Sequence, residues 1–225
     1  MTPTTYDKLL QGSDEWHNQR RGMVTASVVG KLITTKTLKP ASNPESRNLT
    51  GLLVAERITQ WTEDIFISDD MYRGIEDEPK ARNKYAEHYA PVTEVGFMVE
   101  DKWGFEIGYS PDGLVGSDGL IEIKSRRPKK HIETILSGHP PIENMAQMQC
   151  GMLVSGRAWC DYISYAGGLP LWTHRVYPDQ RWFDAIVAAV RAFEANAAEM
   201  IRLYREAVEG LPMTERTLTE IEFTA

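Results

Sequence analysis

Two carboxylates and an amine lie close together in the segment YSPDGLVGSDGLIEIKSRRPKK, residues 109–130. Asp112 follows one expected strand, and Glu122 and Lys124 lie on the next one. Because side chains alternate along a strand, Glu122 and Lys124 share one face and Ile123 points to the other. Antiparallel pairing would bring Asp112 within a few ångströms of Glu122. The spacing therefore predicts a cluster of charged groups at one place on a sheet.

Such a cluster could bind a divalent cation, because neighbouring carboxylates repel each other in its absence. Mg²⁺ takes hard oxygen ligands, commonly one or two carboxylates together with waters and substrate phosphates. The main-chain carbonyl of Ile123 could add a third oxygen. Lys124 would orient or deprotonate a water that attacks phosphorus, and the cation would stabilise charge on the scissile oxygens and the leaving group. Mn²⁺ shares these ligands and could substitute.

The same residues also fit a purely structural role. Asp-Gly pairs are common at hairpin turns, and a Glu and a Lys two residues apart often form the solvated face of an edge strand. Ile121 and Ile123 favour the metal site, because they indicate a strand that is buried on one side and directs its charges toward a cleft.

The surrounding elements predict an α/β domain with a mixed, mainly antiparallel sheet flanked by helices. Helices are expected over 13–22, where Ser13 caps the start and Gly22 the end, and over 25–34, 48–61, 69–90, 142–154 and 179–209. Pro79 should bend the 69–90 helix or start a new one near 78. Strands over 93–100, 103–110 and 119–124 are expected to form an antiparallel meander, and two further strands cover 159–166 and 169–176. A polar loop is expected over 36–48.

Length and charge narrow the class of protein. The 225 residues are 42% hydrophobic and carry a net charge of −7, which suits one globular domain over 1–225, with a core at about 13–176 and a long C-terminal helix at about 179–209. An acidic chain does not coat nucleic acid through bulk charge. No apolar run reaches the length of a membrane span, the N-terminus does not match a signal peptide, and the two cysteines predict no disulfide framework. A reducing cytoplasm is expected.

Four stretches resemble the lambda exonuclease family, the YqaJ-type viral recombinases, within the restriction-endonuclease-like PD-(D/E)xK nucleases. They are WHNQRRGMVTAS (16–27), RGIEDE (73–78), SPDGL with IEIK (110–124) and MAQMQ (145–149). These motifs follow the family's order over about residues 13–165. The resemblance implies a restriction-endonuclease-like core and a Mg²⁺-dependent 5′→3′ exonuclease. Such an enzyme degrades the 5′-ended strand of duplex DNA ends processively and leaves 3′ overhangs for recombination.

The resemblance also implies roles for single residues. The metal ligands are matched by Asp112, Glu122, the Ile123 carbonyl and Glu78. The catalytic positions beside them are matched by Lys124 and Gln147. The pocket for the terminal 5′-phosphate is matched by Arg20, Ser27 and Ser110, and Trp16 matches a residue packed near that pocket.

Each of these residues has a plainer interpretation without the resemblance. Arg20 would be a surface arginine, Glu78 a helix acid before Pro79, and Gln147 part of a polar helix face. The planar guanidinium of Arg20 nevertheless suits a phosphate, with charged hydrogen bonds worth about 1.5–3 kcal/mol. A helix that opens at 25–27 would direct free N–H groups to the same anion. Gln149 should point away from the site.

A basic segment follows the expected catalytic strand. It contains Arg126, Arg127, Lys129, Lys130 and His131. Its arginines and lysines either bind the DNA backbone beyond the cut or form a solvated loop, and their position beside the acids favours phosphate contacts. Whether Met71, Tyr72 or the 36–48 loop separates the DNA strands stays open.

Further partners follow from the resemblance alone. It implies a ring-shaped homotrimer with basic groups on its inner wall, a single-strand annealing protein as partner, and a phage or prophage gene expressed in a bacterial cytoplasm. Two alternatives stay open: a related PD-(D/E)xK endonuclease or repair nuclease, and a non-catalytic DNA-end-binding protein. An endonuclease would cut a closed circle.

Overall fold

The computed structural model describes residues 2–63 and 68–216. It has a mixed α/β fold in which mainly antiparallel sheets are flanked by helices, and this confirms the predicted fold class. The α-helices are α1 (Asp14–Arg20), α2 (Ala26–Val29), α3 (Pro44–Thr59), α4 (Asp69–His88), α5 (Pro128–Ser137), α6 (Met145–Ser155) and α7 (Gln180–Ala207). The 3₁₀ turns are η1 (Gly30–Leu32) and η2 (Ile142–Asn144). The proposal of one domain over 1–225 extends into residues outside the described ranges and stays a prediction.

The strands form two main sheets and a small hairpin. They are β1 (Thr4–Tyr6), β2 (Ile33–Thr34), β3 (Lys39–Pro40), β4 (Val92–Thr93), β5 (Phe97–Glu100), β6 (Ile107–Tyr109), β7 (Gly113–Val115), β8 (Gly119–Ser125), β9 (Trp159–Tyr165) and β10 (Trp172–Val176). The larger sheet has the order β10-β9-β8-β7-β4, and the smaller one has the order β1-β5-β6. β8 and β9 are parallel, since α5 and α6 form the crossover between them.

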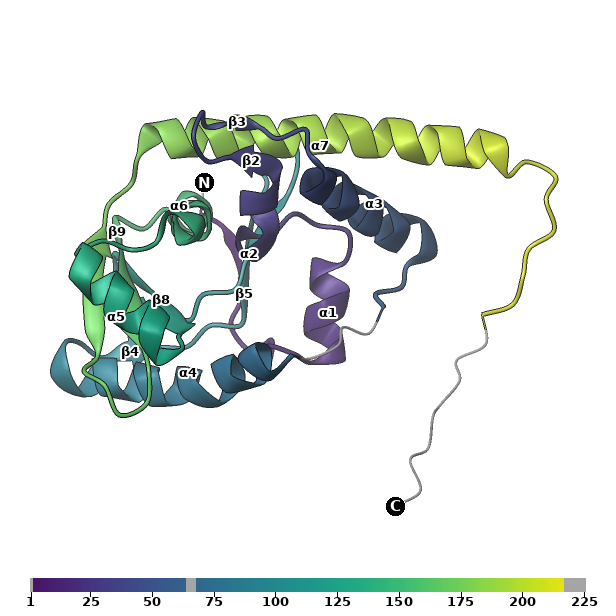
Figure 1. Cartoon of the computed structure of the whole chain (residues 1–225). Helices are drawn as coiled ribbons and strands as arrows, with labels where there is room; N and C mark the ends of the chain where they lie inside the picture. The colour runs from purple at the N-terminus through teal and green to yellow at the C-terminus, as the bar shows by residue number, and fades with distance from the viewer. Residues whose placement is uncertain (1, 64–67, 217–225) are drawn as a thin grey trace, which may run out of the picture.

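Helices cover both faces of the larger sheet, with α6 on one side and α4 on the other (Figure 1). Leu120 and Tyr162 pack in one core cluster with residues of α6 and α7. Ile121 and Ile163 pack in another with residues of α4 such as Tyr85. Full burial of each such side chain contributes about 1.5–3 kcal/mol. β8 is therefore held from both faces.

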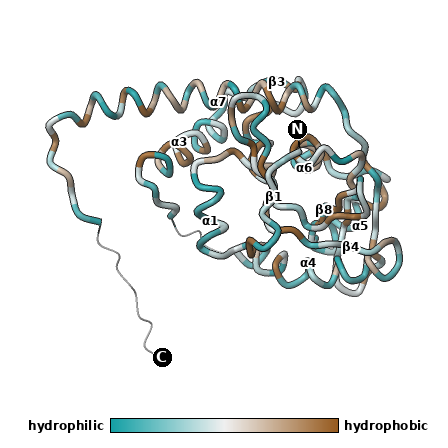
Figure 2. The backbone as a smooth tube through the Cα atoms, turned by 180° about the vertical axis from the view of Figure 1, so that it is seen from behind, coloured by the Kyte–Doolittle hydropathy of each residue, from teal (hydrophilic) through white to brown (hydrophobic). Residues whose placement is uncertain are grey.

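The long helix α7 follows the expected pattern closely. Its buried residues recur at three- and four-residue spacing, from Trp182 through Ile186, Val190 and Phe193. Along the tube of α7, hydrophilic and hydrophobic residues accordingly alternate (Figure 2). In the described part of the chain, no helix combines the length and apolar character that a bilayer crossing requires.

The predicted meander is wrong in two respects. β5 and β6 do pair antiparallel, but they belong to the smaller sheet with β1. β8 instead pairs with β7, a three-residue strand in the segment between the expected strands 103–110 and 119–124. A strand this short has no readable alternation of apolar and polar residues.

Two predictions for helices and one for a loop also need correction. The helix expected over 25–34 ends at Val29, continues as η1 and gives way to β2. The loop expected over 36–48 is largely ordered as β3 and the start of α3, where Asn43 and Ser46 form a capping box. α4 runs unbroken through Pro79, because the packing of Ala81 and Tyr85 outweighs the lost hydrogen bond, a cost of about 3 kcal/mol.

Candidate active site

Glu122 carries a buried carboxylate on the face of β8 that packs toward α6. Its side chain is 0% exposed, and its Oε1 lies 2.7 Å from the Lys124 ammonium. This contact is an ion pair, and neither Glu122 oxygen accepts a hydrogen bond from any other described residue. Burial raises the pKa of Glu122 to about 8, against the opposing effect of Lys124. A buried carboxylate with so few polar partners is costly unless a further cation or water completes its surroundings.

Lys124 links this carboxylate to α6. Its Nζ donates to Oε1 of Gln147 at 2.9 Å. Burial lowers the pKa of Lys124, but Glu122 and Asp112 together outweigh that effect, so the pKa is raised above its usual value. Lys124 is therefore a cation at neutral pH. Gln149, as expected, points elsewhere: it accepts from Asp179 N–H and donates to the Tyr177 carbonyl.

Asp112 approaches β8 where the neighbouring strand β7 begins. Gly113 pairs with Ile121, so the preceding residue lies beside the next part of β8. The Asp112 carboxylate accepts a hydrogen bond from the Ile123 N–H at 2.6 Å. In a strand the N–H and C=O of one residue point to the same side, so the Ile123 carbonyl faces the same open edge. Asp112 therefore lies at this edge of β8, near enough to Glu122 to contribute to raising its pKa.

Arg82 of α4 connects Glu78 to this edge, and the sequence analysis missed it. Its Nε donates to the Asp112 carbonyl oxygen at 2.8 Å, and its other nitrogens pair with Glu78 and with Glu94. Burial and the nearby Asp112 raise the pKa of Glu78 to about 7. Glu78 therefore lies near the acids but is held by Arg82. The motif RGIEDE ends four residues before Arg82, and this one-turn spacing was the available signal.

The donor set at the edge of β8 fits a hard divalent cation. Glu122 offers a carboxylate that pairs only with Lys124 among the described residues, beside Asp112 and the Ile123 carbonyl. Within residues 2–63 and 68–216, no three side chains of His, Cys, Asp or Glu group closely enough to hold an ion by themselves. Mg²⁺ does not require three, because it combines one or two carboxylates with waters and phosphate oxygens.

The residues of the predicted phosphate pocket also meet. Arg20 Nη2 lies 3.3 Å from both the Thr25 and the Ser27 hydroxyls, and its guanidinium stacks 3.7 Å from the ring of Trp16. The Trp16 indole donates to the Ser110 hydroxyl at 2.9 Å. Burial lowers the pKa of Arg20 to about 10, so it stays charged at neutral pH.

This pocket is therefore a cationic group surrounded by hydroxyls, and Ser110 lies two residues from Asp112. Thr25 was not predicted to line it. The helix α2 has only four residues, so the expected helix dipole contributes little.

The basic segment is less uniform than the sequence indicates. Arg126 donates to Asn144 and to the Tyr162 hydroxyl, and its Nε is buried without a partner among the described residues. Lys129 is 89% exposed, and Lys130 pairs with Glu143. His131 does not belong to this basic surface: it is buried and bonded to Ser164 and the Pro170 carbonyl.

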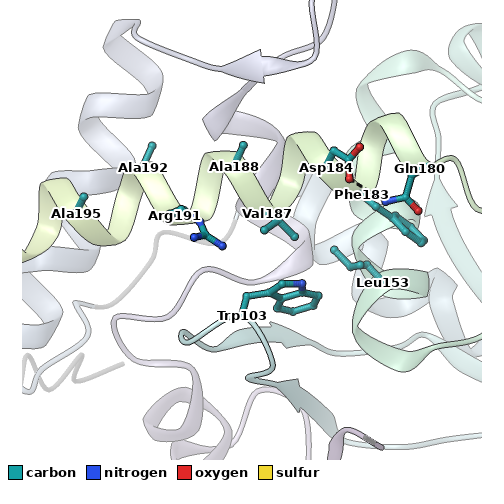
Figure 3. Close-up of a pocket in the computed structure, with 10 residues that line it drawn as sticks. All are labelled: Trp103, Leu153, Gln180, Phe183, Asp184, Val187, Ala188, Arg191, Ala192 and Ala195. Atoms are coloured by element: carbon teal, nitrogen blue, oxygen red, sulfur yellow. Dashed lines mark hydrogen bonds between the residues drawn. The ribbon is translucent and has the colours of Figure 1, made fainter.

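A groove along α7 lies apart from these residues. Trp103, Leu153, Phe183 and Val187 line its apolar part, and Arg191 and Asp184 border it (Figure 3). None of the predicted site residues lines it.

Comparisons with known proteins agree with this arrangement. A family model described as the YqaJ-like viral recombinase domain matches residues 15–158. LHK-Exo, an alkaline exonuclease from Laribacter hongkongensis, is 38% identical over 88% of this chain and 99% of its own, with a TM-score of 0.78. Its complex with dAMP matches with the same identity and coverage and a TM-score of 0.77.

A more distant structure shares the fold alone. A phage-related exonuclease from Haemophilus somnus 129PT is 14% identical over 81% of this chain and 96% of its own, with a TM-score of 0.62. No curated protein matches. The family model spans more than half of the chain and includes all four motifs. The chain therefore belongs to the YqaJ-like viral recombinase family.

Proposed function

We propose that this protein is a Mg²⁺-dependent 5′→3′ exonuclease that acts on ends of duplex DNA, with Mn²⁺ as a possible substitute. The observation that carries this proposal is the buried Glu122 carboxylate, which pairs only with the Lys124 ammonium among the described residues and lies beside Asp112 and the Ile123 edge. The 38% identity to LHK-Exo, an exonuclease solved with a nucleotide, supports the same chemistry.

Asp112, Glu122 and the Ile123 carbonyl would hold the cation, with Glu78 within its electrostatic reach. When bound, the cation would lower the pKa of a water and neutralise charge that develops on the scissile phosphate. Lys124 pairs with the Glu122 carboxylate, and Arg82 pairs with the Glu78 carboxylate. Burial raises the pKa of Glu78, Asp112 and Glu122, although the neighbouring cations act in the opposite direction.

Lys124 would orient the attacking water. An ammonium has three N–H donors; one is directed to Gln147 and another faces Glu122. The third donor is left for a water or a phosphate oxygen. Gln147 limits the rotation of this ammonium and thereby fixes the direction of the third donor.

Arg20, with Ser27 and Ser110 around it, would bind the terminal 5′-phosphate. A guanidinium binds phosphate through parallel N–H groups, and stacking on Trp16 fixes its plane. Because Ser110 and Asp112 lie two residues apart, a phosphate bound here lies close to the cleavage site. This pocket favours an end-dependent enzyme over the alternative endonuclease, since internal cutting requires no terminal anion.

The remaining parts of the proposal concern DNA and partners. Arg126, Arg127, Lys129 and Lys130 would contact the DNA backbone beyond the cut. A homotrimeric ring would explain processive digestion by an acidic chain, and the 3′ overhang would pass to a single-strand annealing protein. We place this activity in recombination of a phage or prophage, in the bacterial cytoplasm.

Nucleotide release from matched DNA substrates tests the proposal. The substrates are a linear duplex with 5′-phosphates, the same duplex with 5′-hydroxyls, and a covalently closed circle, each with Mg²⁺ or with EDTA. We expect release from the phosphorylated duplex with Mg²⁺, slower release from the hydroxyl form, and none from the circle. Cutting of the circle would favour the endonuclease, and end binding without release would favour the non-catalytic alternative.

A further inference from the structure

Two arginines converge on one exposed carboxylate just beyond the end of β8. Asp70 lies in the first turn of α4, and one of its two carboxylate oxygens, Oδ1, accepts three hydrogen bonds. Arg127 donates from Nε at 3.0 Å and from Nη2 at 2.8 Å, and Arg73 donates from Nη1 at 2.7 Å. Paired guanidinium groups around one anionic oxygen also suit a phosphate.

The position of Arg73 is fixed by contacts behind it. Its Nε donates to the Ser125 hydroxyl at 3.2 Å, and this hydroxyl donates in turn to Asp77 at 2.8 Å. Arg73 therefore rests on the end of β8, and its Nη1 stays directed toward Asp70. The site is built from the start of α4, the end of β8 and the N-cap of α5.

The site lies within reach of the proposed cleavage position. Arg127 follows Lys124 by three residues, so their Cα atoms are separated by at most about 11 Å. One strand of duplex DNA carries a phosphate about every 3.4 Å along the helix axis. A phosphate within about three nucleotides of the scissile one can therefore reach these arginines.

The carboxylate that now fills the site can be exchanged. The Asp70 and Arg127 side chains are 55% and 68% exposed, and ion pairs this open to water contribute little to stability. We propose that Arg73 and Arg127 form a subsite for a DNA backbone phosphate, and that Asp70 occupies this subsite until DNA displaces it. The proposal rests on the proposed DNA substrate and adds Arg73 and Asp70 to the site.

Two single substitutions, each of which removes one negative charge, test the role of Asp70. Asp70→Asn removes the competing carboxylate, and Glu199→Gln is the matched control. Asp70 and Glu199 are both 55% exposed and both pair with an arginine three residues later, Arg73 and Arg202. Each variant changes the net charge by the same amount, so a bulk-charge effect would be equal in both.

Binding of a 5′-phosphorylated duplex is measured by fluorescence anisotropy in EDTA, which prevents metal-dependent cleavage, over a series of KCl concentrations. We expect Asp70→Asn to lower Kd about two- to fivefold, as befits an exposed ion pair, and Glu199→Gln to leave it nearly unchanged. Arg73→Gln with Arg127→Gln should reduce the salt slope by about 2. Adding Asp70→Asn to that double variant should no longer tighten binding. Thermal melting checks that each variant is folded.

Equal effects of Asp70→Asn and Glu199→Gln would overturn the inference, and so would a gain from Asp70→Asn that persists without both arginines. In either case the wild-type protein would still degrade linear DNA, so the proposed function would stand. If the wild-type protein neither binds nor degrades DNA, the proposed function fails, and the inference fails with it.

Discussion

At the scale of single residues, Lys124 contacts both Glu122 and Gln147, and we propose that it orients the attacking water. We predict that Lys124→Met lowers nucleotide release by about 10²–10⁴-fold, the usual contribution of a positioned proton-transfer group. DNA-end binding should persist, because the phosphate pocket around Arg20 is separate. Release is measured on a phosphorylated duplex with Mg²⁺, and Lys84→Met, which removes an exposed lysine paired with Glu87, serves as control. Equal rates for Lys124→Met and wild type would contradict this role.

Glu122 should make the stability of the metal-free protein depend on pH. Its pKa in the folded protein is raised to about 8 from a usual value of 4.5. The stability that this group contributes is therefore fully present below about 4.5 and lost as the pH rises through about 8. We expect the free energy of unfolding in EDTA to fall between pH 5 and 8, and to fall less in Glu122→Gln. Glu78 and Asp112 act in the same direction.

Urea denaturation in EDTA at pH 5.5 and at pH 8 measures this difference. Added Mg²⁺ should stabilise the wild type more at pH 8, because a metal binds the ionised carboxylates. If the free energy of unfolding depends on pH equally in Glu122→Gln and in the wild type, Glu122 is not the group responsible.

The sequence predicts the acids well because a two-residue period places Glu122 and Lys124 on one face. It does not predict Arg82, whose role depends on the angle at which α4 crosses the sheet. The burial of His131 is likewise a tertiary property: it depends on Ser164 and Pro170, which are more than thirty residues away in the chain. Composition alone assigned it to the basic surface.

At the scale of elements, Arg82 sets the position of α4 relative to Asp112. We predict that Arg82→Met raises the Mg²⁺ concentration for half-maximal activity by about 10–100-fold, as for other residues that orient metal ligands. The control is Glu94→Gln, which removes only the exposed partner of Arg82. Mn²⁺ binding followed by electron paramagnetic resonance should weaken in parallel. Unchanged Mn²⁺ affinity in Arg82→Met would contradict this account.

A second network fixes the same helix farther along. The Tyr85 hydroxyl donates to Asp161 at 2.6 Å, and Arg175 binds both oxygens of Asp161 while stacking on Trp159. This network ties α4 to β9 and β10, which helps to explain why α4 stays continuous at Pro79.

Long elements with clear periods, such as α7, are predictable from the sequence, whereas short ones are not. α2 and β7 each have fewer than five residues, too few to establish a period. The order of the strands could not be predicted from the sequence either, because β8 pairs with β9 across a crossover of more than thirty residues. The error at Pro79 arose from local propensity, which tertiary packing overrode.

At the scale of the whole molecule, an acidic chain must retain a polyanion during digestion. Net charge is −7, so bulk attraction does not hold the DNA, and we propose a homotrimeric ring. Light scattering in solution should give three times the mass of one chain. A monomer that still digests long duplexes without dissociating would contradict the ring as the source of processivity.

The most direct test of the central claim is the position of a divalent cation. Crystals of the protein with Mn²⁺ should give an anomalous difference peak between the carboxylates of Asp112 and Glu122 and the carbonyl of Ile123. Glu122→Gln crystals prepared in the same way should lose or greatly weaken this peak. A peak elsewhere, or none at this edge of β8, would contradict the account.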